Sequence, residues 1–203
     1  MEIKCLPLGD FGANCYLVKT NFAALVIDPF SADQRVLGFL NENGGLEKYV
    51  LLTHFHFDHI LGANEIRKQT GAKIVIGEKD AIGLIDPTLS LSAMVGVKQD
   101  PFTPDITLAD NQTLNLKDTY ITALHTPGHT EGSVCYILEN VMFSGDTLFK
   151  QSIGRTDFPT GSAANMKASL NRLKGLEKDY IIYSGHGEAT TLFAEIKNNP
   201  YLF

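Results

Sequence analysis

A short segment after an apolar run carries an unusual density of side chains that can bind metal ions. Three imidazoles and one carboxylate stand within six consecutive residues, at His54, His56, Asp58 and His59. Side chains alternate along an extended backbone, so the first two imidazoles point the same way, whereas the last two groups fall on the following turn and can face a second point. Nitrogen and oxygen ligands of this kind suit zinc and, less selectively, iron or manganese. The segment therefore predicts a metal site.

Further candidate ligands stand downstream, each near the end of a predicted strand and close to a glycine or proline. They are His129, Asp146 and His186. Titratable groups in a buried setting are costly unless they are satisfied, so the 54–59 segment is expected to have partners elsewhere in the chain. Loops at strand ends carry functional groups on a rigid scaffold, which makes these three residues the best candidates.

The elements that must position these groups form two series of strands, each followed by helices. Apolar and alternating runs predict strands at 3–8, 14–20, 23–28, 49–53, 73–76, 106–108, 113–116, 120–124, 133–138, 141–143 and 180–184. Helical spacing predicts a helix capped by Ser31 and stopped at Gly44, and further helices at 61–70, 162–173 and 190–198. This order favours an α/β protein with a two-sheet core and helices outside, an αββα sandwich.

One long stretch, Asp86–Pro104, shows no sustained periodicity and contains three prolines. A loop of this length inside a compact domain is usually a lid or a binding loop. The alternative is a plain surface excursion. If the stretch is a lid, it is expected to supply contacts to the substrate.

The pattern HxHxDH at residues 54–59, with its downstream partners in order, resembles the metallo-β-lactamase superfamily over essentially the whole chain. The resemblance implies a single domain of residues 1–203 with two mixed β-sheets flanked by helices. It also implies two divalent metal ions, with zinc favoured and iron or manganese as alternatives. The ligands of the first metal are then His54, His56 and His129, those of the second are Asp58, His59 and His186, and the bridging ligand is Asp146.

Other residues of these segments have no place in the ligand pattern. His125 is expected to be structural. Phe55 and Phe57 alternate with the ligands and are expected to pack beneath the site.

A carboxylate bridge between two cations favours hydrolysis. Such a bridge holds the cations about 3.5–4 Å apart, and they can share one hydroxide. Metal binding lowers the pKa of water toward about 7, which provides a nucleophile at neutral pH. Asp58 and Asp146 are therefore expected to be catalytic as well as metal-binding. All histidines except His125 are assigned to metal, so no general acid remains to protonate a poor leaving group. A thiolate, whose conjugate acid has a pKa of about 8.5, needs little protonation to leave. A thioester is the favoured substrate.

Two further segments resemble the glyoxalase II group (hydroxyacylglutathione hydrolases) and its short bacterial relatives. They are Gly154-Arg155-Thr156-Asp157-Phe158 and the run 185–191. The resemblance implies a thioesterase that cleaves S-lactoylglutathione or a similar small thioester. Arg155 can meet a carboxylate of the substrate, or it can form an ion pair with Asp157 that shapes the loop. The chain is expected to be a short form without the helical C-terminal domain, which leaves the thiol part of the substrate open.

The sequence leaves one main alternative to a thioesterase and disfavours two others. Persulfide dioxygenases are the main alternative, because they resemble the chain in the HxHxDH pattern and the Gly-Arg-Thr-Asp-Phe stretch. They use one Fe²⁺, whose ligands would map to His54, His129 and Asp146. A β-lactamase is disfavoured, because zinc-type lactamases usually place a cysteine in the second site, where this chain has Asp58 and His59. A complete ligand set also disfavours a non-catalytic binding protein.

Composition and charge indicate which kinds of binding partner the protein has. The chain has 203 residues, with 17 Lys and Arg against 23 Asp and Glu, for a net charge of −6. This acidic balance argues against nucleic acid as a partner. No apolar run approaches the roughly 18 residues of a membrane helix, and the N-terminus has no signal pattern, so a cytoplasmic protein acting on a small molecule is expected. The three cysteines, Cys5, Cys15 and Cys135, are expected to be small buried side chains in a reducing compartment.

Overall fold

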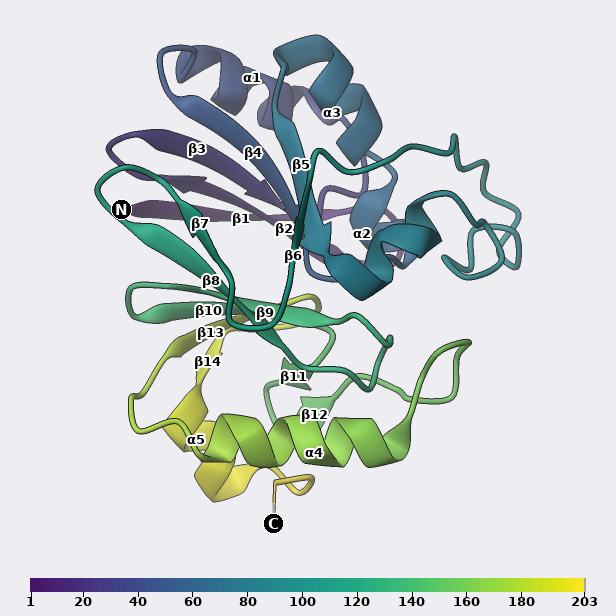
Figure 1. The fold of residues 1–203 in the computed structure, drawn as a ribbon, viewed down its shortest axis with the longest axis vertical. Helices are drawn as coiled ribbons and strands as arrows, with labels where there is room; N and C mark the ends of the chain where they lie inside the picture. The colour runs from purple at the N-terminus through teal and green to yellow at the C-terminus, as the bar shows by residue number, and fades with distance from the viewer. Residues whose placement is uncertain (203) are drawn as a thin grey trace.

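Two six-stranded β-sheets pack face to face in a computed structural model that describes residues 1–202, and helices cover the outer face of each sheet (Figure 1). The first sheet contains, in spatial order, β1 (Glu2–Leu8), β2 (Ala13–Lys19), β3 (Ala23–Ile27), β4 (Glu47–Leu52), β5 (Lys73–Gly77) and β6 (Ile106–Leu108). The second contains β14 (Thr190–Thr191), β13 (Ile181–Ser184), β10 (Val141–Gly145), β9 (Val134–Leu138), β8 (Tyr120–His125) and β7 (Thr113–Asn115). A short hairpin joins β11 (Leu148–Phe149) to β12 (Ser152–Ile153).

Both sheets are mixed, which confirms the predicted αββα class. In the first sheet β1, β2 and β3 are antiparallel and β3 to β6 are parallel. In the second only β10 and β13 are parallel. Parallel neighbours need crossover connections, and helices provide several of them. The helices are α1 (Gln34–Glu42), α2 (Phe57–Ile60), α3 (Ala63–Thr70), the 3₁₀ helix η1 (Glu78–Leu84), α4 (Ala163–Lys174) and α5 (Leu192–Asn198).

Two helix predictions need correction. Helix α1 is capped by Asp33, whose side chain accepts a hydrogen bond from the Arg35 amide, and not by Ser31. The predicted helix 61–70 is α3, which begins at Ala63, and a separate short helix that was not predicted, α2, precedes it and ends before Gly62. A side chain at Gly62 would collide with the Ser31 backbone, so the chain can pass here only as glycine. Helix α2 begins inside the histidine segment and carries Asp58 and His59.

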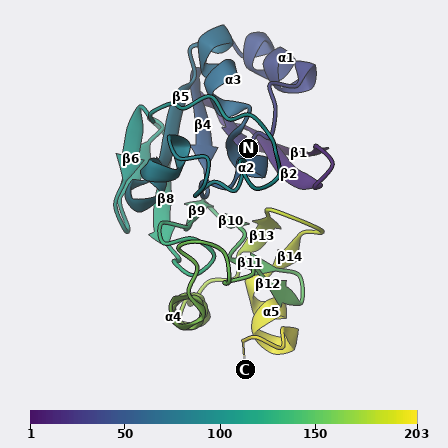
Figure 2. The same ribbon diagram turned by 90° about the vertical axis from the view of Figure 1, so that its right-hand side faces the viewer.

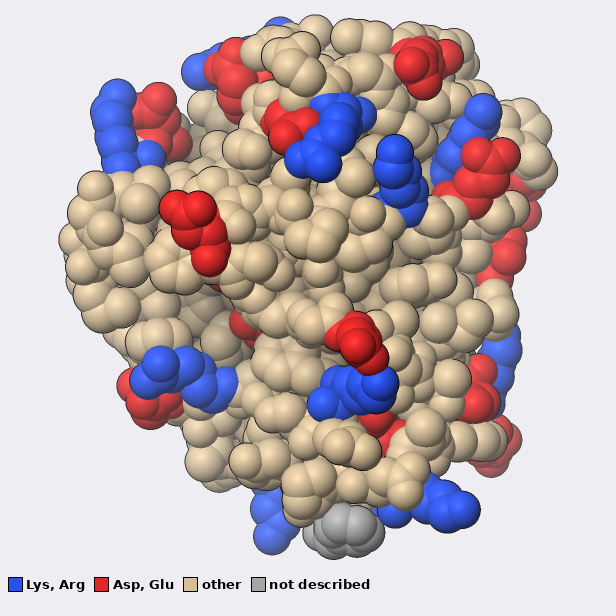
Figure 3. Space-filling model, turned by 180° about the vertical axis from the view of Figure 1, so that it is seen from behind, with Lys and Arg blue, Asp and Glu red and all other residues tan. Residues whose placement is uncertain are grey.

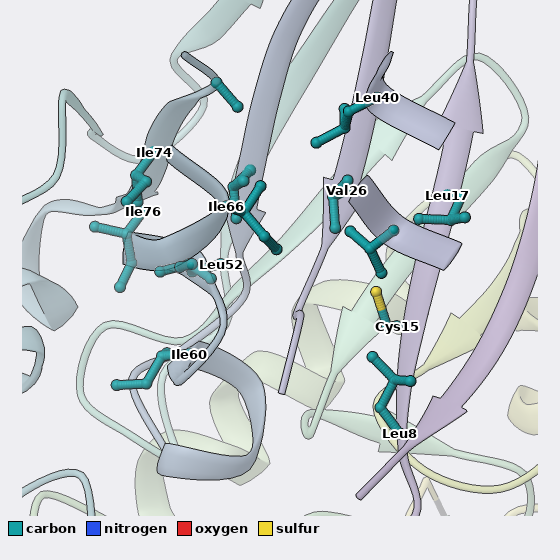
Figure 4. Packing of buried hydrophobic residues seen from close by; sticks show 14 of the residues in the cluster. Leu8, Cys15, Leu17, Val26, Leu40, Leu52, Ile60, Ile66, Ile74 and Ile76 are labelled. Atoms are coloured by element: carbon teal, nitrogen blue, oxygen red, sulfur yellow. The ribbon is translucent and has the colours of Figure 1, made fainter. Parts of the chain in front are cut away.

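Alternate residues of each strand pack on opposite faces of the sheets, which produces three apolar layers. On β2, Cys15 and Leu17 pack in the layer between the first sheet and α1 and α3 (Figure 4). Tyr16 and Val18 pack in the layer between the two sheets. Cys135 lies in a third layer beneath α4 and α5. The packing role expected of Cys15 and Cys135 is therefore confirmed.

Cys5 is exposed, so the expectation that all three thiols are buried is wrong for this residue. The physical reason is its place on β1, an edge strand with several side chains in solvent.

Acidic and basic side chains are interspersed on the face of the molecule seen in Figure 3. That face offers no continuous basic track for a phosphate backbone. Within residues 1–202, none of the helices has the length and apolar character needed to cross a bilayer.

A buried hydrogen bond joins the two sheets just before the histidine segment. The hydroxyl of Tyr136 on β9 donates to the Leu52 carbonyl at the end of β4 over 3.0 Å. We predict that Tyr136→Phe lowers the free energy of unfolding by about 1–2 kcal/mol in denaturant titrations, because the fold loses a buried hydrogen bond. The matched control is Tyr120→Phe, whose side chain is 60% exposed and should change stability by no more than about 0.5 kcal/mol. Equal effects of the two substitutions would contradict the prediction.

Candidate metal centre

The predicted site residues gather at the edge where strands of both sheets end, which faces the viewer in Figure 2. His54 and His56 follow β4, and helix α2 carries the next two candidates. The remaining three follow strands of the second sheet: His129 after β8, Asp146 after β10 and His186 after β13. The strands thus bring together residues that are as many as 132 positions apart in the sequence.

A first group consists of His54, His56 and His129, whose ligand atoms all lie within 4.8 Å of one another. All three side chains are buried. The Nδ1 of His129 lies 2.7 Å from the Arg155 carbonyl oxygen, to which it donates its proton. This hydrogen bond fixes the tautomer, so Nε2 of His129 keeps its lone pair and points at Nδ1 of His56, 2.8 Å away.

A second group consists of Asp58, His59 and His186. The Oδ2 of Asp58 lies 3.6 Å from Nε2 of His59 and 3.4 Å from Nε2 of His186. These contacts place one carboxylate and two imidazole nitrogens around a single point.

Asp146 lies between the two groups. Its Oδ1 is 3.6 Å from Nε2 of His59, and its Oδ2 is 3.4 Å from Nε2 of His129 and 3.6 Å from Nε2 of His186. A side chain at the neighbouring Gly185 would collide with Oδ1, so the close approach of the two loops requires glycine there. One carboxylate therefore reaches both groups, as expected of a bridging ligand.

The donor set fits metal ions. Four buried side-chain atoms within residues 1–202 have no hydrogen-bond partner: Nε2 of His54, His56 and His59, and Oδ1 of Asp146. Buried polar atoms without partners are rare in folded proteins, because each carries an uncompensated desolvation cost. Imidazole and carboxylate lone pairs gathered in this way are ligands for zinc, iron or manganese.

The electrostatics of the site also favour cations. Burial and the neighbouring imidazoles lower the pKa of His54 and lower that of His56 to about 2, so both rings are neutral and can offer a lone pair. Burial alone would lower the pKa of His59, but Asp58, Asp146 and Asp28 outweigh it and raise that pKa to about 10. The carboxylates around His59 thus attract positive charge, and a divalent cation would compete with the proton for its Nε2.

Asp28 is a site residue that sequence reasoning missed. Its carboxylate accepts hydrogen bonds from the Thr53 amide at 2.8 Å and the Thr53 hydroxyl at 2.6 Å, and it lies 3.1 Å from Nδ1 of His59. With its oxygens engaged by these donors, Asp28 orients His59, so that Nε2 faces the second group. Its φ of +52° lies in the left-handed region, which aspartate tolerates better than most residues. The available signal was a carboxylate directly after a buried strand and before a proline.

Asp80 is a second residue that sequence reasoning missed. It is fully buried on η1 and contacts both the loop that follows His129 and the histidine segment. It accepts hydrogen bonds from the Thr130 hydroxyl at 2.6 Å and the Gly132 amide at 2.7 Å. The Phe55 amide, between two of the histidines, also donates to it. One carboxylate thus anchors the loop of His129 and the histidine segment.

The remaining predicted residues are placed as follows. His125 lies outside the metal-ligand groups, and its Nε2 donates to the Leu108 carbonyl at 3.0 Å, in agreement with a structural role. Phe55 packs in the core, as expected. Phe57 lines the pocket, so the expectation that it packs beneath the site is wrong for this residue, because it opens helix α2 at the pocket. Arg155 forms two hydrogen bonds of 2.6 Å with Asp157, the ion pair that was the alternative to substrate binding.

A pocket of about 380 Å³ opens over the two groups and includes part of the loop 86–104. Its volume lies within the range of roughly 300–1,000 Å³ found for small-molecule sites. The long loop therefore adjoins the site, as expected of a binding loop.

Comparison with known proteins identifies the family. The model of the metallo-beta-lactamase superfamily matches residues 8–186, and the chain belongs to this superfamily. The hydroxyacylglutathione hydrolase GloC of Haemophilus influenzae is 34% identical over 209 residues, which cover 100% of this chain and 98% of that protein.

Solved structures agree in fold. The BLEG-1 B3 metallo-beta-lactamase superposes with a TM-score of 0.86 at 34% identity and covers 99% of both chains. TTHA1623, solved in a di-iron-bound form, gives a TM-score of 0.86 at 29% identity, over 98% of this chain and all of the other.

The buried Asp80 generates a prediction about pH. Burial raises its pKa from 3.8 to about 7, so the folded protein retains a proton that the unfolded chain releases. The stability due to the neutral carboxyl is present below about pH 4 and is lost as pH rises to about 7. Asp80→Asn can donate to Thr130 and accept from Gly132 without titrating. We predict that the free energy of unfolding of the wild type falls more between about pH 5 and 7.5 than that of Asp80→Asn.

The measurement is chemical denaturation of both proteins across this pH range. Asp80→Ala is the companion variant and should be less stable at every pH, by about 1–3 kcal/mol, because buried donors lose their acceptor. Parallel curves for the wild type and Asp80→Asn would show that Asp80 does not titrate as described.

Proposed function

We propose that the protein is a metal-dependent hydrolase that cleaves small thioesters, of the kind that glyoxalase II enzymes act on. The observation that carries the proposal is the meeting of two three-residue groups at one carboxylate, Asp146, in a pocket at the end of both sheets. Membership of the metallo-beta-lactamase superfamily and the likeness to GloC support it.

The proposed ligands follow from the two groups. His54, His56 and His129 would hold a first metal, and Asp58, His59 and His186 a second, with Asp146 shared between them. When bound, divalent cations lower the pKa of water toward neutrality and polarise a carbonyl group. We propose zinc because imidazole and carboxylate donors suit it, with iron or manganese as alternatives. The di-iron-bound form of TTHA1623 supports iron as one of these alternatives.

The side chains around the pocket favour a leaving group that needs no general acid. Apart from the proposed ligands, the lining residues of the described chain are apolar or glycine, with the exception of Arg155. An arginine stays protonated in proteins, so it cannot serve as a general acid. A thiolate leaves without such an acid, because the pKa of a thiol is only about 8.5. The site is therefore suited to thioesters rather than to amides or alkyl esters.

Arg155 is proposed to border the substrate. Its Nε and one terminal nitrogen are engaged by Asp157, and its guanidinium lies 3.9 Å from the centre of the Phe158 ring. Its other terminal nitrogen makes no hydrogen bond within the described chain, so it can contact a polar group of a substrate in the pocket that Arg155 lines.

The function is tested by thiol release under argon from S-lactoylglutathione and from S-acetyl-N-acetylcysteamine, with protein that carries its metals. We predict thiol release without oxygen consumption. A parallel oxygen-electrode run with glutathione persulfide tests the dioxygenase alternative, and a chromogenic cephalosporin tests β-lactam hydrolysis, which the likeness to BLEG-1 raises. Oxygen uptake or cephalosporin cleavage without any thiol release would overturn the proposal.

Asp146 and Cys135 form a contrasting pair for mutagenesis. We predict that Asp146→Ala lowers kcat/KM by at least about a hundredfold, because the two groups lose their shared carboxylate, while circular dichroism remains that of the wild type. Cys135→Ser should leave turnover nearly unchanged, since the thiol is buried in the layer beneath α4 and α5 and its neighbour Thr126 can bond a hydroxyl. Loss of metal from Cys135→Ser would contradict the ligand assignment.

A further inference from the structure

We propose that the substrate carries an apolar acyl chain, which packs against the loop 86–104 and the aromatic side chains around the metal centre. The inference rests on the proposed thioesterase function and names its substrate class: medium-chain acyl thioesters rather than thioesters selected for a charged thiol such as glutathione.

An apolar wall of the pocket over the candidate metal centre is formed by Phe11, Phe57, Leu91, Met94 and Val95, which come from three separate segments. Phe11 and Phe57 meet edge to face, with ring centres 5.0 Å apart.

Phe149 and Phe158 also line the pocket. The Phe158 ring centre lies 5.6 Å from that of His56, and the Phe149 ring centre lies 6.1 Å from that of His186. Apolar surface therefore lies directly beside the residues proposed to hold the metals.

Several of these side chains are exposed to solvent. Met94 is 66% exposed, Phe11 is 53% exposed and Val95 is 36% exposed. Exposed apolar residues that gather around a polar centre mark a binding surface, because a ligand that covers them removes apolar area from water. Methionine in particular adapts its shape to flexible apolar ligands.

The loop that presents Met94 and Val95 is built to hold its position. The Ser90 carbonyl accepts from the Phe57 amide at 2.9 Å, which ties the loop to α2. Inside the loop, Gln99 is buried; its amide nitrogen donates to the carbonyls of Gly83 and Leu84 at 3.0 and 2.9 Å, and its oxygen accepts from the Ser90 hydroxyl. The apolar wall is thus a fixed part of the pocket.

Charge complementarity argues against glutathione as the recognised part. Glutathione presents two carboxylates and one ammonium group. Arg155 is the sole Lys or Arg among the described residues that line the pocket, and Asp157 already neutralises it through two bonds of 2.6 Å. Lys150, in the loop between β11 and β12, is likewise paired with Glu188 at 2.6 Å. An apolar chain needs none of these charges.

The test uses thioesters of one small uncharged thiol, N-acetylcysteamine, with acetyl, butyryl and hexanoyl groups, beside S-lactoylglutathione. We expect kcat/KM to rise about three- to fourfold for each methylene group added, until the pocket is filled. Met94→Gln should reduce the ratio between hexanoyl and acetyl thioesters several-fold. Phe193→Gln, which changes an exposed apolar residue of α5 away from the pocket, should leave that ratio unchanged.

Binding provides a readout that does not depend on turnover. Non-cleavable thioethers of N-acetylcysteamine with the same chain lengths should bind with dissociation constants that fall with length in calorimetry. Equal dissociation constants along this series would overturn the inference. So would a kcat/KM for S-lactoylglutathione above that of the hexanoyl thioester with no dependence on chain length, although the thioesterase function would stand. Failure of every thioester to react would instead contradict the proposed function.

Discussion

Collecting seven imidazole and carboxylate groups at one edge of two sheets is the constraint on which the rest of the structure depends. Four of the histidines are buried and the other three groups are partly buried, and several of their atoms have no hydrogen-bond partner in the described chain. Such a cluster is unstable alone, because desolvated polar groups cost free energy unless opposite charges or donors compensate them. The fold must therefore hold these groups against their own electrostatics and offer them to cations.

Rigid neighbours supply that support. Asp28 holds Thr53 and His59, and Asp80 holds the loop of His129 against the histidine segment. Tyr136 links the two sheets at the residue where β4 ends. Each of these contacts joins segments that are distant in the sequence, so the geometry of the centre depends on how the sheets pack and not on any one loop. The same packing leaves an apolar pocket beside the centre, which gives a physical basis for substrate selection.

Much of this could be predicted from local pattern. The strands β6 to β10 and β13 and the helix predicted at 162–173 follow from alternation and helical spacing, and the histidine spacing indicated a metal site, whereas the short strands β11, β12 and β14 were not predicted. What could not be predicted depends on tertiary contacts. The break at Gly62 arises from its approach to Ser31, and the roles of Asp28 and Asp80 arise from neighbours at least 25 residues away. The apolar wall of the loop around Met94 likewise appears only when the loop folds over the site.

The central claim is that the two groups hold two metal ions that share Asp146, and anomalous diffraction from crystals of the metal-loaded protein tests it most directly. We predict two peaks, one among His54, His56 and His129 and one among Asp58, His59 and His186, each strongest above the zinc absorption edge if zinc is the native metal. A single peak above the iron edge, bound by His54, His129 and Asp146, would contradict the dinuclear centre and favour the dioxygenase alternative.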